Sequence, residues 1–422
     1  LKPLLLEKMD MPFGNTIYAA GFLLGLNTSF QKAAGTANDT NEAFFNDMMK
    51  VSQGKADPAL THKVVDNCTR LLEWLHSDCG INFKTGARLV WPQLTRSHLV
   101  TGDVQPGGAY LAMTLMKKAE SLGVEVRTGN KVVALLSDPK KGNVNGVRVK
   151  NENGLSEVYA KYGVVLSTGG YSANQELVTQ FIGSAGAKMP IRGSRIIAGE
   201  NIVLTAPFMP KVVNVDQFHC GPIYGPTGAN PLNIVNNGVC VNRQGKRFID
   251  EVGTRDVVSA AEIAQTGSYS WLVVDQAMVD ASSVIQGYIK KGYTVTGATY
   301  EELGKAMGVD AAAFAETMEK WNGYVEAKND PDFGRTSFAN PLNTAPYYAV
   351  KVTAGVHHTM GGLKINANTE VLNEKGEVIP GLFAAGEVTG GVHGANRLGG
   401  NAVADFTVFG RIAGAAASDY AA

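Results

Sequence analysis

Cysteine is scarce in the sequence, and no long apolar run is present. The 422 residues include four cysteines, Cys68, Cys79, Cys220 and Cys240, and none of them forms a C-x-x-C or C-x-x-C-H motif. This spacing excludes a zinc ribbon and a c-type haem attachment site within the sequence. We expect buried thiols, and a disulfide between Cys68 and Cys79 stays an open alternative. No apolar run is long enough to span a bilayer.

The sequence also lacks an excess of charge of either sign. Lysine plus arginine and aspartate plus glutamate both number 38, so the formal net charge is zero. No basic stripe indicates a nucleic-acid partner, and no polybasic tail indicates a membrane surface. A hydrophobic content of 45% together with 49 glycines is typical of an α/β enzyme with many tight turns. At roughly 150 residues per domain, the length predicts two or three lobes.

Helical periodicity is clear in five segments. Apolar residues recur at intervals of three and four in them, as expected for amphipathic helices. The predicted helices are residues 41–51, 58–79, 107–122, 300–307 and 311–327.

One stretch near the end of the sequence combines a strand, a glycine-rich loop and a helix. Residues 381–385 form a short apolar run typical of a buried strand, the loop ends at Gly399 and Gly400, and helical spacing begins at about Asn401. This order directs backbone N–H groups and a helix dipole toward an anion or an electron-rich ring. Arg397 lies inside the loop, and a guanidinium binds a carboxylate through two parallel hydrogen bonds.

This loop, GEVTGGVHGANRLGGNA, and the upstream segment GVHHTMGGL carry a family resemblance. They resemble the flavoproteins of the fumarate reductase and succinate dehydrogenase family, most of all soluble flavocytochrome c-type fumarate reductase and urocanate reductase. The resemblance implies an α/β fold with an α+β cap. A Rossmann-like FAD-binding domain would comprise residues 1–213 and 359–422, and residues 214–358 would form an inserted, mobile capping domain. FAD is expected to bind without a covalent bond.

The start of the sequence departs from that family. Residues 4–7 form a short apolar strand that ends in Glu7, followed by Lys8. In dinucleotide-binding folds an acid in this place hydrogen-bonds a ribose. The G-x-G-x-x-G loop that should precede the strand is missing, and a complete βαβ unit needs about thirty residues. We therefore expect a flavin domain that lacks its first βα unit.

The resemblance assigns further residues to the cofactor. Most lie in short loops of small residues, and others lie in a hairpin near the adenine or in the C-terminal loop and helix. The expected cofactor-binding residues are Glu7, Lys8, Gly14, Asn15, Thr16, Ala20, Gly21, Val133, Thr168, Gly169, Gly170, Glu200, His358, Glu387, Ala402 and Val403. No metal site is expected.

The implied reaction is reduction of the C=C bond of an α,β-unsaturated carboxylate. Flavin N5 would pass a hydride to one alkene carbon, and Arg255 would protonate the other. Arginine rarely releases a proton, so this role rests on the resemblance alone. The expected catalytic residues are Arg255, His357, Arg397 and His219. The expected substrate-binding residues are Gly21, His219, His357, Arg397 and Gly400.

A second departure concerns the proton supply and the substrate. The family's glutamate and arginine that relay protons align with Pro231 and Ile234, and residues 222–240 contain no charged side chain and no histidine. The relay is then absent, or it is rerouted through water, Tyr224, Asp250 or Glu251. The apolar segment also favours a substrate with one carboxylate and a less polar far end, such as an aryl or alkyl acrylate.

Two other functions stay open, a flavin-binding or electron-transfer protein without turnover and a 3-ketosteroid dehydrogenase-like flavoenzyme. The joint presence of Arg255, His357 and Arg397 favours the reductase over both. The implied partners are a small unsaturated carboxylate and an electron donor, either a haem or flavin domain or a separate redox protein, as in anaerobic respiration. The compartment is unknown from the residues, and only the resemblance favours the periplasm or cell envelope over the cytoplasm.

Three further residues, Phe22, Arg96 and His98, each have two possible roles. Phe22 either narrows the substrate side of the flavin or packs in the core. Arg96 and His98 either line the approach to the flavin or lie in a surface loop.

Overall fold

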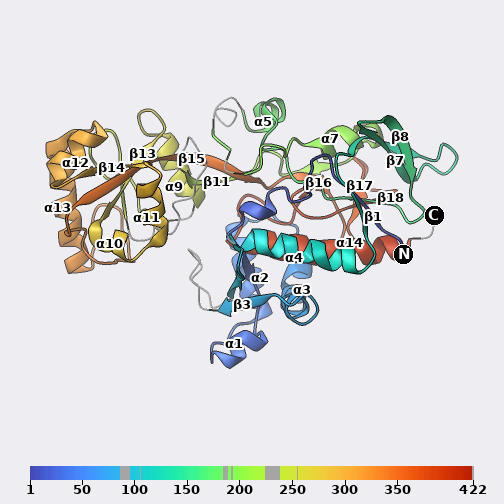
Figure 1. Ribbon diagram of the computed structural model, residues 1–422, viewed down its shortest axis with the longest axis horizontal. Coiled ribbons are helices and arrows are strands. Elements are labelled where there is room, and N and C mark those ends of the chain that lie inside the picture. The colour runs from blue at the N-terminus through green and yellow to red at the C-terminus, as the bar shows by residue number, and fades with distance from the viewer. Residues whose placement is uncertain are drawn as a thin grey trace. The chain divides into compact units, whose positions relative to one another are not determined.

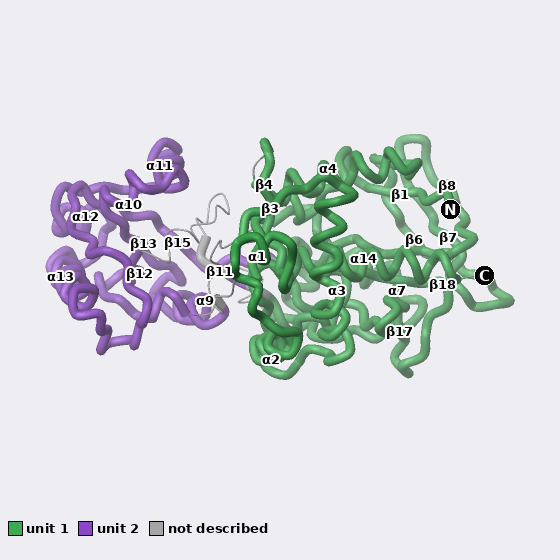
Figure 2. Tube along the Cα trace, turned by 90° about the horizontal axis from the view of Figure 1, so that it is seen from below, with its two compact units in different colours: residues 1–187, 193–218, 358–422 green, residues 188–192, 219–357 purple. Residues whose placement is uncertain are grey.

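The structure is a computed structural model that describes residues 1–85, 96–104, 106–183, 189–191, 193–223, 238–253 and 255–420 (Figure 1). It divides into two compact units that each mix helices and strands (Figure 2). Unit 1 comprises Leu1–Ala187, Gly193–Phe218 and His358–Ala422, and unit 2 comprises Lys188–Arg192 and His219–His357. The fold is therefore of the mixed α/β class. The FAD-binding and capping roles given to residues 1–213, 214–358 and 359–422 stay predictions.

Unit 1 is built on several small sheets. Its strands are β1 (Leu4–Leu6), β2 (Phe22–Leu24), β3 (Asn82–Thr85), β4 (Ser97–Thr101), β5 (Glu125–Arg127), β6 (Lys131–Ser137), β7 (Val144–Asn151), β8 (Gly154–Tyr159), β9 (Val164–Leu166), β10 (Val212–Val213), β16 (Gly362–Lys364), β17 (Glu370–Leu372), β18 (Val378–Ala384) and β19 (Thr389–Gly390). β1 pairs with β5 in parallel, and the other sheets have the orders β17–β18–β9, β6–β7–β8, β2–β4–β3 and β10–β16–β19. In the first of these, β18 and β9 run parallel.

Several helices of unit 1 begin where the sequence supplies a side-chain cap. α3 starts at Pro58, and the Asp57 side chain before it accepts a hydrogen bond from the Ala59 N–H, which satisfies one of the free donors of the first turn. The helical elements are α1 (Ser29–Ala33), α2 (Asn41–Val51), α3 (Pro58–Ser77), α4 (Gly107–Ser121), α5 (Gln175–Ile182), α7 (Glu200–Thr205), α14 (Asn401–Asp419), η1 (Thr16–Tyr18) and η2 (Ala206–Phe208). The helices predicted at residues 41–51, 58–79 and 107–122 are confirmed within two residues.

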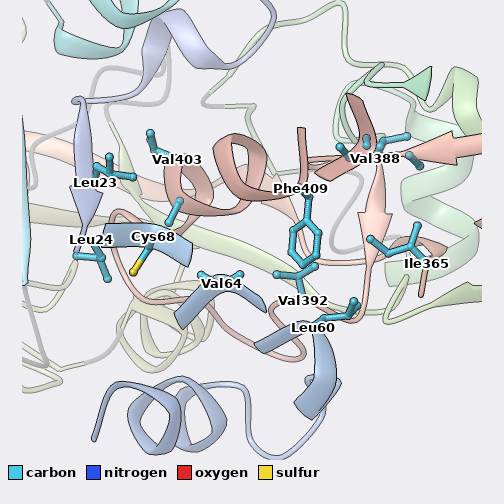
Figure 3. Close-up of a cluster of buried hydrophobic side chains, with 14 of the residues drawn as sticks. Leu23, Leu24, Leu60, Val64, Cys68, Ile365, Val388, Val392, Val403 and Phe409 are labelled. Carbon is cyan, nitrogen blue, oxygen red and sulfur yellow. The ribbon is translucent and has the colours of Figure 1, made fainter. Parts of the chain in front are cut away.

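One hydrophobic core holds α14 against α3 and β2 (Figure 3). Phe409 of α14 is fully buried, and it lies with Leu60 of α3 and Val392 of the preceding loop. Burying one such side chain contributes about 1.5–3 kcal/mol. The core therefore anchors both the helix and the glycine-rich loop that leads into it.

Arg96 and His98 are buried, so the prediction that they lie in a surface loop is wrong. Arg96 is 1% exposed and forms ion pairs with Asp39 and Asp47. His98 is in β4, and its Nε2 lies 2.7 Å from the Thr28 hydroxyl. These contacts tie the chain from Thr28 to Asp47, which includes α1, to Arg96 and β4, because a buried guanidinium requires its carboxylate partners. Whether either residue lines the approach to the flavin stays a prediction.

In unit 2, helices cover both faces of one sheet. Its strands are β11 (Phe218–Ile223), β12 (Val239–Val241), β13 (Ser270–Asp275), β14 (Thr294–Gly297) and β15 (Tyr347–Thr359), with β11–β15–β13–β12 in order and β14 beside β15. Its helices are α9 (Arg255–Ile263), α10 (Gln276–Asp280), α11 (Ser283–Lys290), α12 (Tyr300–Met307) and α13 (Ala311–Ala327). The predicted helices at residues 300–307 and 311–327 are confirmed.

Alternation along the strands of unit 2 produces two separate cores. Trp271 and Val273 of β13 pack in the cluster that contains Trp321 of α13, whereas Leu272 and Val274 pack in the other cluster. Successive side chains of a strand point to opposite faces. The sheet is therefore covered on both sides.

The cysteines are free thiols. Cys68, Cys220 and Cys240 are buried and Cys79 is partly buried, so the open alternative of a Cys68–Cys79 disulfide is wrong. Burial raises the pKa of the Cys68 thiol to about 11. No helix within the described ranges combines the length and apolarity needed to cross a membrane.

Candidate functional site

Two parallel neighbours, β9 and β18, end side by side and position the site. Val164 pairs with Leu382, and Leu166 pairs with Ala384, so both carboxyl ends lie at one edge of the sheet. The loops that leave this edge are residues 167–170 and 385–387. Ligands of open α/β sheets bind at the carboxyl ends of the strands. This edge is therefore the candidate binding edge of unit 1.

Glu387 joins these loops to a segment near the start of the chain. Its Oε1 accepts a hydrogen bond from the Thr359 N–H at 3.0 Å, and its Oε2 accepts one from Asn15 Nδ2 at 2.8 Å. A Cβ at Gly170 would lie 2.7 Å from Glu387 Oε1, so only glycine fits there. Burial raises the pKa of Glu387, and the bonds from Asn15 and Thr359 oppose that rise. The structure thus brings together three expected cofactor residues, Asn15, Gly170 and Glu387.

Lys8 and Glu200 form a second contact among the expected cofactor residues. They make an ion pair, and Lys8 also donates a hydrogen bond to the carbonyl of Ile196 at 2.6 Å. Nearby, the Ser194 N–H donates to Asn15 Oδ1 at 2.7 Å. The segment from Ser194 to Glu200 therefore lies along the segment from Lys8 to Asn15. Glu200 is the first residue of α7, where an acid is favoured by the helix dipole.

A buried polar cluster lies between β15 and α14. The ring centroids of His358 and His393 are 5.6 Å apart. His393 Nε2 lies 3.0 Å from Asp405 Oδ2, and both of these side chains are 3% exposed. Arg397 is buried as well, and its Nη1 donates to the carbonyl of Leu398 at 3.0 Å. Four polar side chains, those of His358, His393, Asp405 and Arg397, are therefore buried in one environment with little water.

His358 is neutral in this environment. Burial lowers its pKa well below the ordinary value, and the positive charge of Arg397 and the proximity of His393 lower it further. Burial also lowers the pKa of His393, whereas Asp405 raises it. A neutral imidazole offers one donor and one acceptor nitrogen. His358 can therefore hydrogen-bond a flavin ring without adding a positive charge.

His393 and Asp405 are absent from the residues expected from the sequence. The histidine lies inside the quoted glycine-rich motif, but its partner is five positions into α14. An acid that is 2% exposed within an apolar helix needs a polar partner. An aspartate on the helix face expected to be buried therefore predicts that a polar partner exists. It does not predict which residue that partner is.

The N-terminal end of α14 lies beside Arg397 and has no side-chain cap. Gly400 caps this helix of 19 residues at φ +87° and has no side chain to accept from the first turn. The Asn401 and Val403 N–H groups donate to the carbonyls of Leu398 and Gly400 at 3.2 and 3.1 Å, whereas the N–H of Ala402 has no such bond among the described residues. Asn401 is 1% exposed, and its Oδ1 has no hydrogen-bond partner among the described residues. The polar edge of FAD can hydrogen-bond with groups of this kind: the Ala402 N–H, the buried Asn401 Oδ1 and neutral His358.

The other expected residues of unit 1 lie on separate elements. Gly21 has φ +90°, and a Cβ there would lie 2.7 Å from the Cα of Gly107, so it permits the packing of the loop against α4. Val133 lies in β6 and is 38% exposed. Glu7 follows β1, and its carboxylate accepts from the Met9 N–H at 2.7 Å. The remaining positions are Gly14, Thr16, Ala20, Thr168 and Gly169 in loops or η1, and Phe22, which begins β2 and is partly exposed.

Three expected catalytic residues belong to unit 2. Arg255 is the first residue of α9, and His219 and His357 lie in β11 and β15. The side chains of Arg255 and His219 lie outside the described residues, as do Tyr224, Pro231 and Ile234. His357 and His358 are consecutive in β15, so they face opposite sides of the strand. In the described part of the chain, no three His, Cys, Asp or Glu side chains are grouped to hold a metal ion.

Glu251 is saturated by ion pairs, which disfavours it as a proton relay. Its carboxylate accepts from Arg247 Nε and Nη2, both at 2.9 Å, and from Arg335 Nη1 at 3.0 Å. Arg247 also pairs with Asp330 at 2.9 Å. All four side chains are at most 4% exposed. Both oxygens of the Glu251 carboxylate are therefore occupied by guanidinium donors.

The comparisons with known proteins agree with this geometry. The chain matches the family model described as "FAD binding domain" over residues 1–403. It is 36% identical over 426 residues to the fumarate reductase (cytochrome) of Shewanella frigidimarina, and the alignment covers 99% of this chain and 73% of that protein. It is 31% identical over 429 residues to the urocanate reductase of Eggerthella lenta, covering 98% and 70%.

A solved structure shows the same fold. The open conformation of a flavocytochrome c3 fumarate reductase aligns with a TM-score of 0.85 at 33% identity, covering 99% of this chain and 74% of that chain. The cofactor is FAD. The chain therefore belongs to the fumarate reductase family of FAD-dependent oxidoreductases, which act on CH–CH groups.

Proposed function

We propose that the protein reduces the C=C bond of a small α,β-unsaturated carboxylate. The observation that carries this proposal is the placement of Arg397, which is buried beside the uncapped start of α14 and near neutral His358. A buried guanidinium at the start of a helix binds a carboxylate strongly, because the surroundings contain little competing water and the helix dipole favours an anion there. Such an anchor polarises the adjacent alkene.

The residues of this chain have distinct roles in the reaction. Bound FAD, held without a covalent bond, supplies the hydride at N5. Arg397 and His357 hold the substrate carboxylate, with Gly21 and Gly400 alongside, and His219 contacts the far end of the substrate. Arg255 donates the proton that the second alkene carbon needs. Each reduction therefore consumes one hydride and one proton, and the protein must replace the proton after every turnover.

The cofactor contacts follow from the same assignment. Glu7 binds the adenosine ribose, and Val133 lies near the adenine. The loops at Gly14–Thr16 and Thr168–Gly170 follow the pyrophosphate and flavin, together with Ala20, Lys8, Glu200 and Glu387. The N–H groups of Ala402 and Val403 donate to the edge of the flavin ring, and His358 lies against the ring. Residues 214–358 serve as the cap that closes over the substrate.

The substrate carries one carboxylate and a less polar far end. Residues 222–240 have no charged side chain that could bind a second carboxylate. A desolvated dianion without a partner at one end is costly. Acrylates with alkyl or aryl substituents therefore suit the chain better than fumarate. The electron donor is a haem or flavin domain or a separate redox protein, and the cell envelope is the compartment that the resemblance favours.

The test is an anaerobic reoxidation experiment. The purified protein is reduced with dithionite, and fumarate, acrylate, methacrylate, cinnamate or urocanate is added while the oxidised flavin band is followed. Rapid reoxidation by one of these acids supports the proposal, and a strong preference for fumarate refutes the single-carboxylate assignment. Bound flavin that no acid reoxidises supports a flavin-binding protein without turnover.

A matched pair of variants tests the anchor. Arg397→Gln should slow reoxidation by about 10- to 100-fold at low substrate concentration, because hydrogen bonds to a charged group contribute about 1.5–3 kcal/mol. Arg148→Gln removes a guanidinium that is 47% exposed and should change nothing. Equal rates for the two variants would remove Arg397 from the site.

A further inference from the structure

Helix α9, which begins at Arg255, carries a second ionisable group on its buried side. Glu262 is 1% exposed. Its Oε1 accepts a hydrogen bond from the Ser270 hydroxyl at 2.6 Å, and its Oε2 has no hydrogen-bond partner among the described residues. Burial raises the pKa of Glu262 to about 7, and the bond from Ser270 lowers it only in part. This carboxyl therefore exchanges its proton near neutral pH.

Among the described residues, no charged group forms an ion pair or a hydrogen bond with Glu262. The groups that face it are the Ser270 hydroxyl from β13 and the thiols of Cys220 in β11 and Cys240 in β12. Burial raises the pKa of both thiols, and the proximity of Glu262 adds to the rise, so these thiols stay protonated. Glu251, by contrast, is a buried acid with two arginine partners. Within the part of the chain that the structure describes, Glu262 therefore takes part in no ion pair.

Ser259 lies between Glu262 and the start of the helix. It is 2% exposed, and its Oγ has no hydrogen-bond partner within the described residues. Positions 255, 259 and 262 are four and three residues apart, which places them on one face of a helix. Seven residues span roughly 10 Å along the axis. Two buried polar atoms without partners, one turn apart, fit a bridging water that satisfies both.

We propose that Glu262, acting through Ser259, is the proton reservoir that reloads Arg255 after each reduction. The inference rests on the proposed function. The proton leaves Arg255 for the alkene carbon, and the neutral guanidine takes a proton from the Ser259 hydroxyl. Ser259 regains its proton from the Glu262 carboxyl through the bridging water. The resulting carboxylate is protonated again from bulk water, so no electrons move in the relay.

This arrangement answers the loss of charged groups from residues 222–240. A relay needs groups that accept and release a proton near the working pH. Both carboxylate oxygens of Glu251 are occupied by arginine donors, whereas Glu262 is a buried acid on the same helix as Arg255. Glu262 and Ser259 are positioning and proton-supplying residues, and neither needs to touch the substrate.

The experiment measures kcat and KM for the preferred acid between pH 5.5 and 9 with dithionite-reduced methyl viologen as electron donor. Glu262→Gln keeps the hydrogen bond with Ser270 but cannot carry the proton. Its kcat should fall by about 10²-fold, the lower end of the range for proton-transfer groups. Its KM should stay within about twofold, since Arg397 and His357 bind the acid. Glu319→Gln, an exposed glutamate of α13, is the matched control and should behave as wild type.

The pH profile separates a relay from a structural role. In wild type, kcat should decline as pH rises through about 7, because the loaded reservoir is the protonated form. In Glu262→Gln this decline of kcat with rising pH, the alkaline limb of the profile, should be absent. Glu262→Asp should restore part of kcat and part of the limb. Ser259→Ala, a small change, should also lower kcat with KM unchanged, so the test does not depend on one variant folding.

The outcomes distinguish the two proposals. Wild-type kcat and an unchanged limb in Glu262→Gln, with Ser259→Ala also at wild-type rate, would overturn the relay while the reductase function stands. A uniform loss of activity at every pH with a retained limb would assign Glu262 a structural role and would equally overturn it. A wild-type protein that reduces no acid would refute the proposed function, and the relay with it.

Discussion

Replacing Glu262 with glutamine should make the protein more stable, and only at neutral and alkaline pH. In the folded protein the Glu262 carboxyl keeps its proton up to about pH 7, whereas its ordinary pKa is 4.5. Between these values the folded state binds a proton that the unfolded chain has released. The free energy of unfolding therefore falls as pH rises through this window. Glutamine has no proton to lose, so the free energy of unfolding of the variant does not fall with pH on account of this position.

The size of the effect follows from the two pKa values. Each pKa unit corresponds to 1.36 kcal/mol, so the difference between 4.5 and about 7 corresponds to roughly 3 kcal/mol. Because the side chain is 1% exposed, little of this is lost to solvent screening. The variant should match wild type at about pH 4.5 and exceed it by roughly 3 kcal/mol above pH 8. Glutamine also keeps the contact with Ser270, so no cavity offsets the gain.

The assay is urea unfolding at pH 5 and pH 8.5, followed by tryptophan fluorescence. Trp271 and Trp321 are buried in unit 2, which contains Glu262, and Trp74 and Trp91 belong to unit 1, so the signal reports on both units. Glu319→Gln controls for loss of a glutamate from the surface. A variant that is less stable than wild type at pH 8.5, or a gain of equal size at both pH values, would refute the reasoning about burial.

Three further predictions concern the surroundings of Glu251, Asp405 and Gly170. Glu251→Gln removes the carboxylate that two buried arginines share, although Arg247 keeps its pair with Asp330, and should cost about 3–5 kcal/mol in urea unfolding; a cost below about 1 kcal/mol would mean that water replaces the pair. Asp405→Ala removes the acceptor of His393 and should cost about 1.5–3 kcal/mol, whereas Asp405→Asn, which retains an acceptor, should cost less; equal losses would show that packing decides. Gly170→Ala places a Cβ 2.7 Å from a glutamate oxygen and should reduce the FAD bound after purification, read as the flavin-to-protein absorbance ratio. Gly287→Ala, with open space around it, is the control and should bind FAD normally.

Local patterns in the sequence were sufficient for several elements. The helices at residues 41–51, 300–307 and 311–327 have the predicted bounds. Their starts are set by Thr40, Thr299 and Asp310, whose side chains accept from the first turn. Caps and apolar periodicity involve residues within one or two turns, so the sequence displays them directly. The glycine-rich loop and its family were visible for the same reason.

The tertiary structure decided what depends on distant partners. Arg96 is buried because Asp39, 57 residues earlier, accepts from it, and no local pattern indicates that pair. Glu387 receives Asn15 from 372 residues away. Likewise, only when the chain packs do His393 and Asp405 become a pair and does Glu262 become a buried carboxyl that accepts from Ser270. Local preference sets where a helix begins, whereas the charge that a buried group carries depends on how much water and which partners the fold leaves beside it.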